Sequence, residues 1–450
     1  MGWWSSPAHA TDDAAPRRSR RRAGPAGGLV VLAALVAWNV GNYVFFLAAG
    51  RMLGPHDFGL AAALLAVTVM ASVPGNALQY GVARSVAAAG RSSGAVASAV
   101  YRRAWRTSLR LLPFAALAIA AAVAVARLVE DETPVGPLLL TGAVVLPMAA
   151  LFLSLGQLQG DERYRPYAAT FASWGVPRPV LLLPLAAAGL GVYAALGATA
   201  LAVLGAAALG ALLTGGRLRE RGEPAPEQWR AFTAALPPVV VGLAAVACLT
   251  NLDVVAAKLA LSSADAGYYG AEAVLGKAVI VVPQALSTIL LPRVAARRAG
   301  GGDTGRVLAL ATLITLAVGA LVALACLPSA SLITRIAFGS DYAPGASLLA
   351  PLVVASTLLG VAILLVAHHT ARGDHRFVWA MGPVVALHVA LLAVLGGSGG
   401  GIVWANIAAG AAVICVHEAI HGRGSDGLAA GLVRLARAPR GSAGDAGPHP

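Results

Sequence analysis

The fold is decided by residues 48–63, which read AAGRMLGPHDFGLAAA and separate two long apolar runs. The flanking runs, 29–50 and 58–80, each reach the ~20 apolar residues that a membrane-crossing helix requires. A polar Gly-Pro break between two such runs predicts a helical hairpin within a lipid bilayer.

The same alternation of apolar runs and short polar breaks continues along all 450 residues. Apolar residues make up 58% of the chain and charged residues only 12%, against roughly a quarter charged in soluble domains. This composition excludes a soluble globular protein, a disordered chain and a disulfide scaffold. We expect an all-α integral membrane protein with about twelve transmembrane helices, at residues 29–50, 58–80, 109–127, 137–157, 168–189, 191–213, 234–256, 267–291, 307–328, 346–367, 377–395 and 401–420.

The basic residues indicate the orientation of the chain. The sequence has 33 Lys and Arg against 20 Asp and Glu, a formal net charge of +13. Most lie in the N-terminal tail and in alternate loops, whereas the other loops hold only Arg51, Arg127, Lys258 and Arg335. The positive-inside rule therefore predicts that both termini are cytoplasmic. Because the charge follows topology in this way, we expect no nucleic-acid partner.

The chain resembles itself at an offset of about 208 residues. A second copy of the opening stretch reads AAKLALSSADAGYYGA (256–271), in which Asp265 and Gly267 match Asp57 and Gly59. Two parallel repeats of six spans are typical of transporters, in which the substrate path lies between the halves. The matched repeats therefore predict two six-helix lobes.

The repeat also defines the expected domain boundaries. The matched prolines Pro74 and Pro283 should kink spans two and eight at equivalent places. We expect a disordered basic cytoplasmic tail (1–28), an N-terminal lobe (29–213), a cytoplasmic linker loop (214–233), a C-terminal lobe (234–422) and a second cytoplasmic tail (423–450).

Four blocks of sequence resemble a known family. They are AGRMLGPHDFGLAAALLAVTVMASVPGNALQYGVARSVA (49–87), GQLQGDERYRPYA (156–168), NLDVVAAKLALSSADAGYYGAEAVLGKAV (251–279) and FGSDYAPGASLLAPL (338–352). In order and spacing they resemble the bacterial polysaccharide (lipid-linked oligosaccharide) flippases. These belong to the multidrug/oligosaccharidyl-lipid/polysaccharide exporter superfamily. The resemblance covers roughly 30–420.

The resemblance implies a V-shaped, two-lobe bundle in the bacterial plasma membrane. Such a protein flips a polyprenyl-diphosphate-linked oligosaccharide by alternating access, for cell-surface polysaccharide biosynthesis. Its partners would be the lipid-linked glycan, membrane lipid, and a polysaccharide polymerase or glycosyltransferases. We expect no cofactor, because the sequence contains no P-loop or dinucleotide fingerprint.

Polar and ionisable residues within the spans are the candidates for substrate binding, because holding them in lipid is costly. Arg178, between two prolines, is interpreted either as a phosphate contact or as a snorkelling side chain. Lys277 is interpreted as a head-group contact. The amides fit either sugar binding or helix–helix hydrogen bonds. The other cavity candidates are Arg84, Asn42, Gln79 and Asn251.

Two carboxylates within the spans, Asp253 and Glu272, are candidates for ion pairing or ion coupling. Asp253 is expected to pair with Lys277 or Lys258 across helices, or else to exchange a proton and couple transport to the proton gradient. Glu272 precedes Lys277 by five residues, which is a poor ion-pair spacing on one helix.

The rival functions are a cation-coupled multidrug exporter of the same superfamily and an intramembrane zinc metalloprotease. An exporter would be expected to carry an acid in span one, where this chain has Asn39 and Asn42. His417, Glu418 and His421 form an H-E-x-x-H motif, but it ends the last span with no later helix to enclose a metal. We therefore expect a transporter and no metal site. Three other histidines are interpreted as interfacial: His368, His369 and His375.

Overall fold

The computed structural model describes residues 25–89, 94–129, 134–220, 222–287, 305–422 and 427–436. The first half of the described chain contains α1 (Pro25–Ala71), α2 (Val73–Ala89), α3 (Gly94–Val129), α4 (Val135–Gly160), α5 (Tyr164–Gly175), α6 (Arg178–Ala187) and α7 (Val192–Arg219). The second half contains α8 (Pro226–Ala260), α9 (Ser263–Gly276), η1 (Lys277–Ile280), α11 (Gly305–Ala337), η2 (Ser340–Leu348), α12 (Leu349–Arg372), α13 (His375–Leu395), α14 (Gly399–His421) and α15 (Leu428–Ala436). Most of the two predicted tails, 1–28 and 423–450, lies outside the described residues.

The first helix, α1, contains the first membrane crossing and most of the second. Its 47 residues measure about 70 Å at 1.5 Å per residue, more than twice the ~30 Å hydrocarbon core. The helix is broken at Gly54, where φ is 72°, a region that glycine enters without steric cost. Pro55 follows and removes a backbone donor. The hairpin predicted from the Gly-Pro pair therefore turns at Gly54.

The remaining crossings follow from helix length and composition. Nine helical stretches of the described chain are long and apolar enough to cross a membrane, and the first covers both arms of α1 and α2. That first stretch counts as two crossings because of the break at Gly54. α3, with 36 residues, and the α5–α6 pair are also long enough to cross. The expected all-α, twelve-crossing membrane fold is confirmed.

Proline distorts three of the crossings. α5 and α6 are separated at Val176 and Pro177, where the two prolines around Arg178 predict an opened helix. Pro74 follows the break between α1 and α2, and Pro283 follows the short 3-10 helix η1. The second and eighth crossings are thus interrupted just before their matched prolines, as expected.

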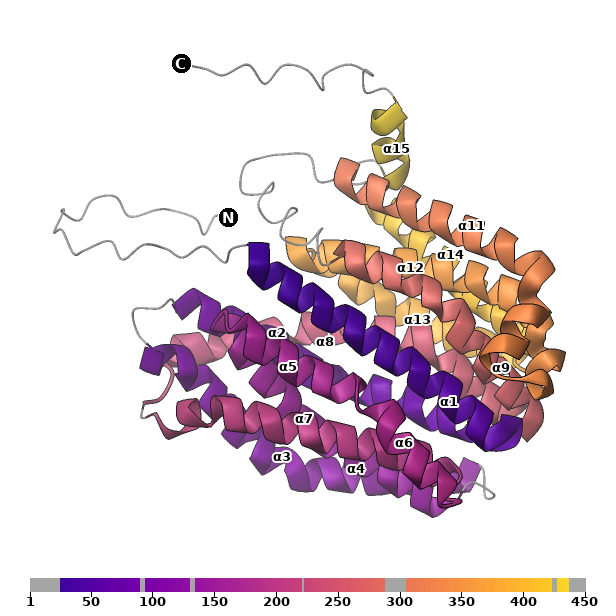
Figure 1. Ribbon diagram of the computed structural model, residues 1–450. Coiled ribbons are helices and arrows are strands. Elements are labelled where there is room, and N and C mark those ends of the chain that lie inside the picture. The colour runs from indigo at the N-terminus through magenta and orange to yellow at the C-terminus, as the bar shows by residue number, and fades with distance from the viewer. Residues whose placement is uncertain are drawn as a thin grey trace.

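Figure 1 shows how the helices are arranged around α1. The helices α3, α4, α6 and α7 lie on one side of it, and α11, α12, α13 and α14 lie on the other. α1 packs against α5 and α6 of the first half and against α8 and α9 of the second. We call the end of the molecule near Gly54 the kink end, and the opposite end, where α1 begins, the terminal end.

The two halves meet in tight contact at the kink end. A Cβ added at Gly59 would lie 2.8 Å from the backbone nitrogen of Gly267, and one added at Gly267 would lie 1.9 Å from the carbonyl oxygen of Pro55. Tyr342 Oη donates a hydrogen bond of 2.7 Å to the carbonyl oxygen of Gly50. The two glycines matched by the repeat therefore touch each other, and small residues allow this close helix packing.

Candidate substrate cavity

A cavity of about 260 Å³ lies between α1 on one side and α8, α9, η1 and α12 on the other. We call it the central cavity. Its aromatic lining comes from α1 and consists of Trp38, Tyr43 and Phe46. Its polar lining consists of Asn39, Asn42, Thr250, Asn251, Lys277 and Gln284. Among the described residues, the lining contains one cation and no carboxylate, most of the other lining residues are apolar, and both halves contribute.

Lys277 lies where α9 ends and the η1 turn begins, which directs its side chain toward α8. Its Nζ is 2.8 Å from Asp253 Oδ1, so the sequence alternative of pairing with Lys258 is not adopted. The Asp253 side chain is fully buried, whereas that of Lys277 is 18% exposed. The pair therefore presents its cation to the central cavity and keeps its carboxylate behind the wall.

A buried polar network holds the Asp253 carboxylate in place. Tyr269 Oη donates to Asp253 Oδ2 at 3.0 Å, and Asn406 Nδ2 donates to the same oxygen at 3.2 Å. Asn406 Oδ1 in turn lies 2.8 Å from His388 Nε2. These contacts link α8, α9, α13 and α14. A carboxylate with several donors keeps its position when its cation moves away.

The amides of the central cavity differ from ordinary helix-packing amides. Asn39 Nδ2 and Asn251 Nδ2 each donate to a carbonyl of their own helix, at 2.9 Å. Among the described residues, neither side chain forms a hydrogen bond to a different helix. Of the two sequence alternatives, this geometry favours a cavity role over interhelical bonding for these two amides.

Arg178 lies one layer behind the cavity wall. Its side chain is buried, and its guanidinium donates to Asn42 Oδ1 and, at 2.9 Å, to Thr199 Oγ1. The guanidinium carbon also lies 3.9 Å from the ring centre of Phe45, a cation–π contact. Arg178 therefore does not snorkel to the interface. It orients Asn42 and adds positive charge behind the cavity.

Replacing Arg178 with Ala is expected to lower the stability of the protein by about 3 kcal/mol, because it removes two hydrogen bonds and a buried stacking contact. The midpoint of thermal unfolding in detergent measures the change. Arg165→Ala, an exposed arginine on α5, is the matched control and should change stability by less than about 0.5 kcal/mol. An Arg178→Ala variant that melts like wild type would contradict the packing role assigned to this side chain.

Three other sequence candidates lie outside the central cavity. Gln79 Nε2 donates to Gln159 Oε1 at 3.1 Å, which joins α2 to α4. Arg84 is exposed near the end of α2. Glu272 is buried and accepts a hydrogen bond of 2.7 Å from Thr334 Oγ1, so it faces α11 and not Lys277. The structure thus brings together Asn42, Asn251, Lys277 and Asp253, with Arg178 behind them.

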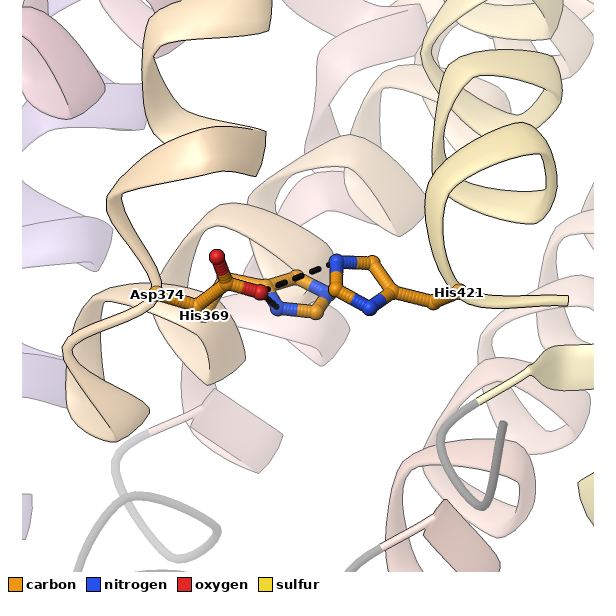
Figure 2. A group of neighbouring side chains, drawn as sticks. All are labelled: His369, Asp374 and His421. Carbon is orange, nitrogen blue, oxygen red and sulfur yellow. Dashed lines mark ion pairs between the residues drawn. The ribbon is translucent and has the colours of Figure 1, made fainter. Parts of the chain in front are cut away.

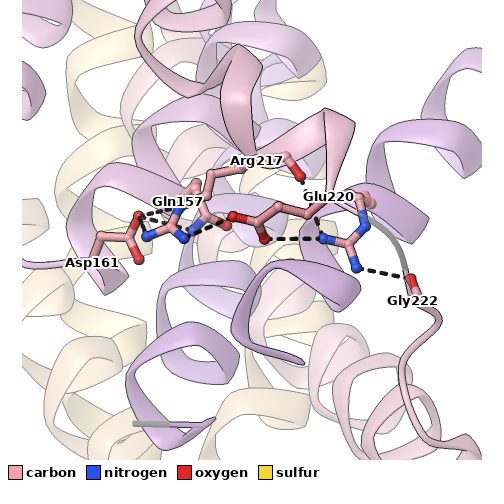
Figure 3. A network of polar contacts seen from close by, with 6 residues as sticks. Gln157, Asp161, Arg217, Glu220 and Gly222 are labelled. Atoms are coloured by element: carbon pink, nitrogen blue, oxygen red, sulfur yellow. Dashed lines mark hydrogen bonds and ion pairs between the residues drawn. The ribbon is translucent and has the colours of Figure 1, made fainter. Parts of the chain in front are cut away.

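A network of ion pairs fixes the terminal end of the first half (Figure 3). Arg217 lies between two acids, with Nη2 3.1 Å from Asp161 Oδ2 and Nη1 3.0 Å from Glu220 Oε1. Arg102 extends the network, with Nη1 3.4 Å from Glu220 Oε2 and Nη2 2.8 Å from the carbonyl oxygen of Gly222. The network ties α3, α4 and α7 to Gly222, in the short connection between α7 and α8.

Arg217→Gln is expected to lower stability by roughly 1 kcal/mol, because the network is partly exposed and surface ion pairs contribute little each. The loss should shrink at about 0.5 M salt, where exposed charges are screened. Thermal unfolding at low and high salt measures both effects, with the exposed Arg219→Gln as control. An unfolding midpoint of Arg217→Gln that does not depend on salt would contradict an electrostatic role.

The H-E-x-x-H motif does not have the geometry of a protease site. Glu418 Oε1 accepts the backbone N–H of Leu428 at 2.7 Å and lies 3.2 Å from His417 Nδ1. A general base must instead reach a metal-bound water. Glu418 holds the start of α15, so the weakest sequence alternative gains no support.

No protein family matches the sequence, and no characterised protein matches it either. The fold, however, matches solved structures over almost the whole chain. The lipid II flippase MurJ in an inward closed conformation has a TM-score of 0.65 and 12% identity, and the match covers 91% of both chains. An inward-facing multidrug resistance MATE transporter of the MOP superfamily has a TM-score of 0.63 and 16% identity, over 90% of this chain and 98% of that one. The chain has the fold of the MOP superfamily.

A third MOP-fold structure concerns the polarity of the cavity. It is a MOP superfamily transporter from Pyrococcus furiosus, described as having a binding pocket of reversed polarity that suggests a different function. It has a TM-score of 0.53 and 15% identity, over 92% of this chain and 99% of that one. The MOP fold expected from the four sequence blocks is confirmed. Because flippases and drug exporters share it, substrate class has to be argued from the cavity.

Sequence reasoning missed three residues of the polar network: Tyr269, Asn406 and His388. Asn406 and His388 are polar residues within apolar spans, and this placement could have marked them as candidates. Tyr269 gave no such signal, because its ring is apolar and only the fold places its hydroxyl beside Asp253. Within the MOP fold, these side chains complete the support of the Lys277–Asp253 pair.

Proposed function

We propose that the protein is a flippase that carries a polyprenyl-diphosphate-linked oligosaccharide across the bacterial plasma membrane, for assembly of cell-surface polysaccharide. The observation that supports this most strongly is the positive charge in the central cavity. Lys277 supplies the cation, and the lining residues that the structure describes include no carboxylate. A diphosphate needs cations and hydrogen-bond donors, whereas a cationic drug needs an acid in the cavity.

The Lys277–Asp253 ion pair links binding of the substrate to a change in conformation. A diphosphate in the central cavity competes with Asp253 for the Lys277 ammonium, now 2.8 Å from the carboxylate. When Lys277 turns to the phosphate, Asp253 keeps the donors Tyr269 and Asn406 but loses its cation. Uptake of a proton or another cation by this carboxylate would couple transport to an ion gradient, since an unpaired buried charge is costly.

The rest of the lining suits a glycan. The amides Asn39, Asn251 and Gln284 offer donors and acceptors to sugar hydroxyls, and Trp38 and Tyr43 offer flat apolar surfaces to sugar rings. The polyprenyl tail stays in the bilayer while the head group crosses. A cavity of about 260 Å³ lies below the ~300–1,000 Å³ typical of ligand pockets, so head-group entry requires the halves to separate.

Alternating access would be a rocking of the lobes 29–213 and 234–422 about the linker 214–233. The tight contact of Gly59 with Gly267 then represents the closed kink end. The distribution of basic residues supports a terminal end in the cytoplasm and a kink end outside. A polymerase or glycosyltransferase would contact the head group at the kink end or at the terminal end.

A deletion strain tests this function directly. The expected result is accumulation of lipid-linked oligosaccharide in the inner leaflet and loss of surface polymer. Wild type and Lys258→Gln should rescue both, whereas Lys277→Gln should not. Lys258 is the matched control because it is the only other lysine in the sequence and lies at the kink end, outside the central cavity. Normal lipid intermediates together with impaired efflux of organic cations would favour the multidrug exporter instead.

A further inference from the structure

Three side chains from three different helices converge at the terminal end of the second half (Figure 2). His369 lies in the last turn of α12, Asp374 immediately precedes α13, and His421 is the last residue of α14. Asp374 Oδ2 lies 3.2 Å from His369 Nδ1 and 2.9 Å from His421 Nε2. The two imidazole rings are stacked, with centres 4.3 Å apart. The chain thus brings two nitrogens and one carboxylate oxygen to a common point.

The distances fit a shared metal ion. Zinc binds histidine nitrogen and carboxylate oxygen at ~2.0–2.2 Å, which places neighbouring tetrahedral ligands ~3.3 Å apart. One ligand atom from each of His369, Asp374 and His421 lies within 4.8 Å of the other two. To bind one ion, the two rings must turn out of their stack so that both nitrogens point at it. Neither imidazole–carboxylate contact has hydrogen-bond geometry, which leaves the nitrogens available for an ion.

Burial supports the same conclusion. The His369 side chain is completely buried, and its ring nitrogens have no hydrogen-bond partner. A buried imidazole without a partner is costly, and metal binding removes that cost. The side chains of Asp374 and His421 are 22% and 17% exposed, so an ion has a route of entry from the surface.

A backbone hydrogen bond orients the Asp374 carboxylate. Asp374 Oδ1 accepts the backbone N–H of Arg376 at 3.1 Å and so caps α13, which leaves Oδ2 to face the histidines. Support of this kind for a ligand is a regular feature of metal sites. His417 is beside the cluster, with its ring centre 5.2 Å from that of His369, but its Nδ1 faces Glu418.

We propose that His369, Asp374 and His421 bind a divalent transition metal of the Zn²⁺ class at the terminal end of α12, α13 and α14. Two imidazoles and one carboxylate select such ions over Mg²⁺ and Ca²⁺, which prefer oxygen ligands. Water completes the coordination. Because the ligands come from three helices, the ion ties together the ends of the helices that carry Asn406 and His388. The site pairs His421 with His369, and not with His417 as the H-E-x-x-H motif would.

Metal binding to the full-length protein in detergent tests the proposal. The protein carries an affinity tag without histidine, is stripped with EDTA and is titrated with ZnCl₂ against a chromophoric chelator. We expect one ion per chain and a thermal unfolding midpoint that rises with zinc. His369→Asn and His421→Asn should each weaken binding at least ~10-fold and abolish the zinc-dependent rise. His375→Asn, an exposed histidine next to Asp374, should bind like wild type.

Two results would overturn the proposal. One is a stripped wild-type protein that binds no zinc at stoichiometric protein concentration and does not change its melting curve. This result concerns the wild-type protein alone, so it does not depend on whether the variants fold. The other is retained affinity in His369→Asn combined with lost affinity in His417→Asn, which would assign the metal to the H-E-x-x-H motif. Size-exclusion chromatography of each variant without zinc confirms that it is folded.

Discussion

Lys277→Gln is expected to abolish flipping of the lipid-linked oligosaccharide, with transport reduced at least ~100-fold. Within the described part of the chain, Lys277 is the single charged side chain that lines the central cavity. A charge-assisted contact to phosphate is among the strongest hydrogen bonds available, and glutamine does not supply the charge. Leaflet-resolved measurement of the lipid-linked oligosaccharide gives the rate.

The same substitution also affects stability, and this effect must be separated from the loss of binding. Removal of the Lys277 ammonium leaves Asp253 buried without a cation, which costs about 3–5 kcal/mol. The double variant Asp253→Asn/Lys277→Gln removes both charges and should recover most of the lost stability. Because it still lacks the cation, it should remain inactive. A stable double variant that transports at the wild-type rate would show that Lys277 serves only the ion pair.

Gly267→Val is expected to reduce transport to below about a tenth of the wild-type rate by preventing closure of the kink end. A Cβ at this position would lie 1.9 Å from the carbonyl oxygen of Pro55. That atom belongs to the backbone beside the Gly54 break, so no side-chain rotation relieves the overlap. Alternating access requires each end to close in turn, and α9 can no longer approach α1.

The accessibility of the central cavity reports this change independently of transport. A single cysteine at Thr250, introduced after replacement of Cys248, Cys326 and Cys415, lines the cavity. A membrane-impermeant thiol reagent added on the kink side should label it faster in Gly267→Val than in the parent. Gly205→Val is the matched control, because a Cβ there meets nothing within 4 Å. Equal labelling in all three proteins would contradict the assignment of the kink end as a gate.

The membrane fold was predictable because it depends on local composition. Lipid requires ~20 apolar residues per crossing, and that requirement is visible in each run of the sequence. The hairpin at Gly54 and the break around Arg178 were also predictable, since glycine and proline determine the backbone locally. The structure brings Asn42, Asn251 and Lys277 to one cavity, and their role in binding substrate stays a prediction.

The part of the site that could not be predicted depends on which face of each helix meets which neighbour. Glu272 and Lys277 are five residues apart, yet one faces α11 and the other faces Asp253. Arg178 faces inward toward Asn42 because α6 begins anew after the proline break. The sequence assigns His421 to the H-E-x-x-H motif and His369 to the interface, and it gives no reason to join either to Asp374, because the three come from the ends of three helices. Side-chain convergence of this kind follows from helix packing, which composition does not specify.

The most direct test of the central claim is flipping by the purified protein in proteoliposomes. A polyprenyl-diphosphate oligosaccharide with a fluorescent sugar is incorporated into both leaflets, and an impermeant reductant destroys the fluorescence of the outer one. We expect wild type and Lys258→Gln to expose the inner pool far faster than protein-free vesicles, and Lys277→Gln not to do so. Flipping no faster than in protein-free vesicles, by folded protein supplied with an ion gradient, would contradict the central claim.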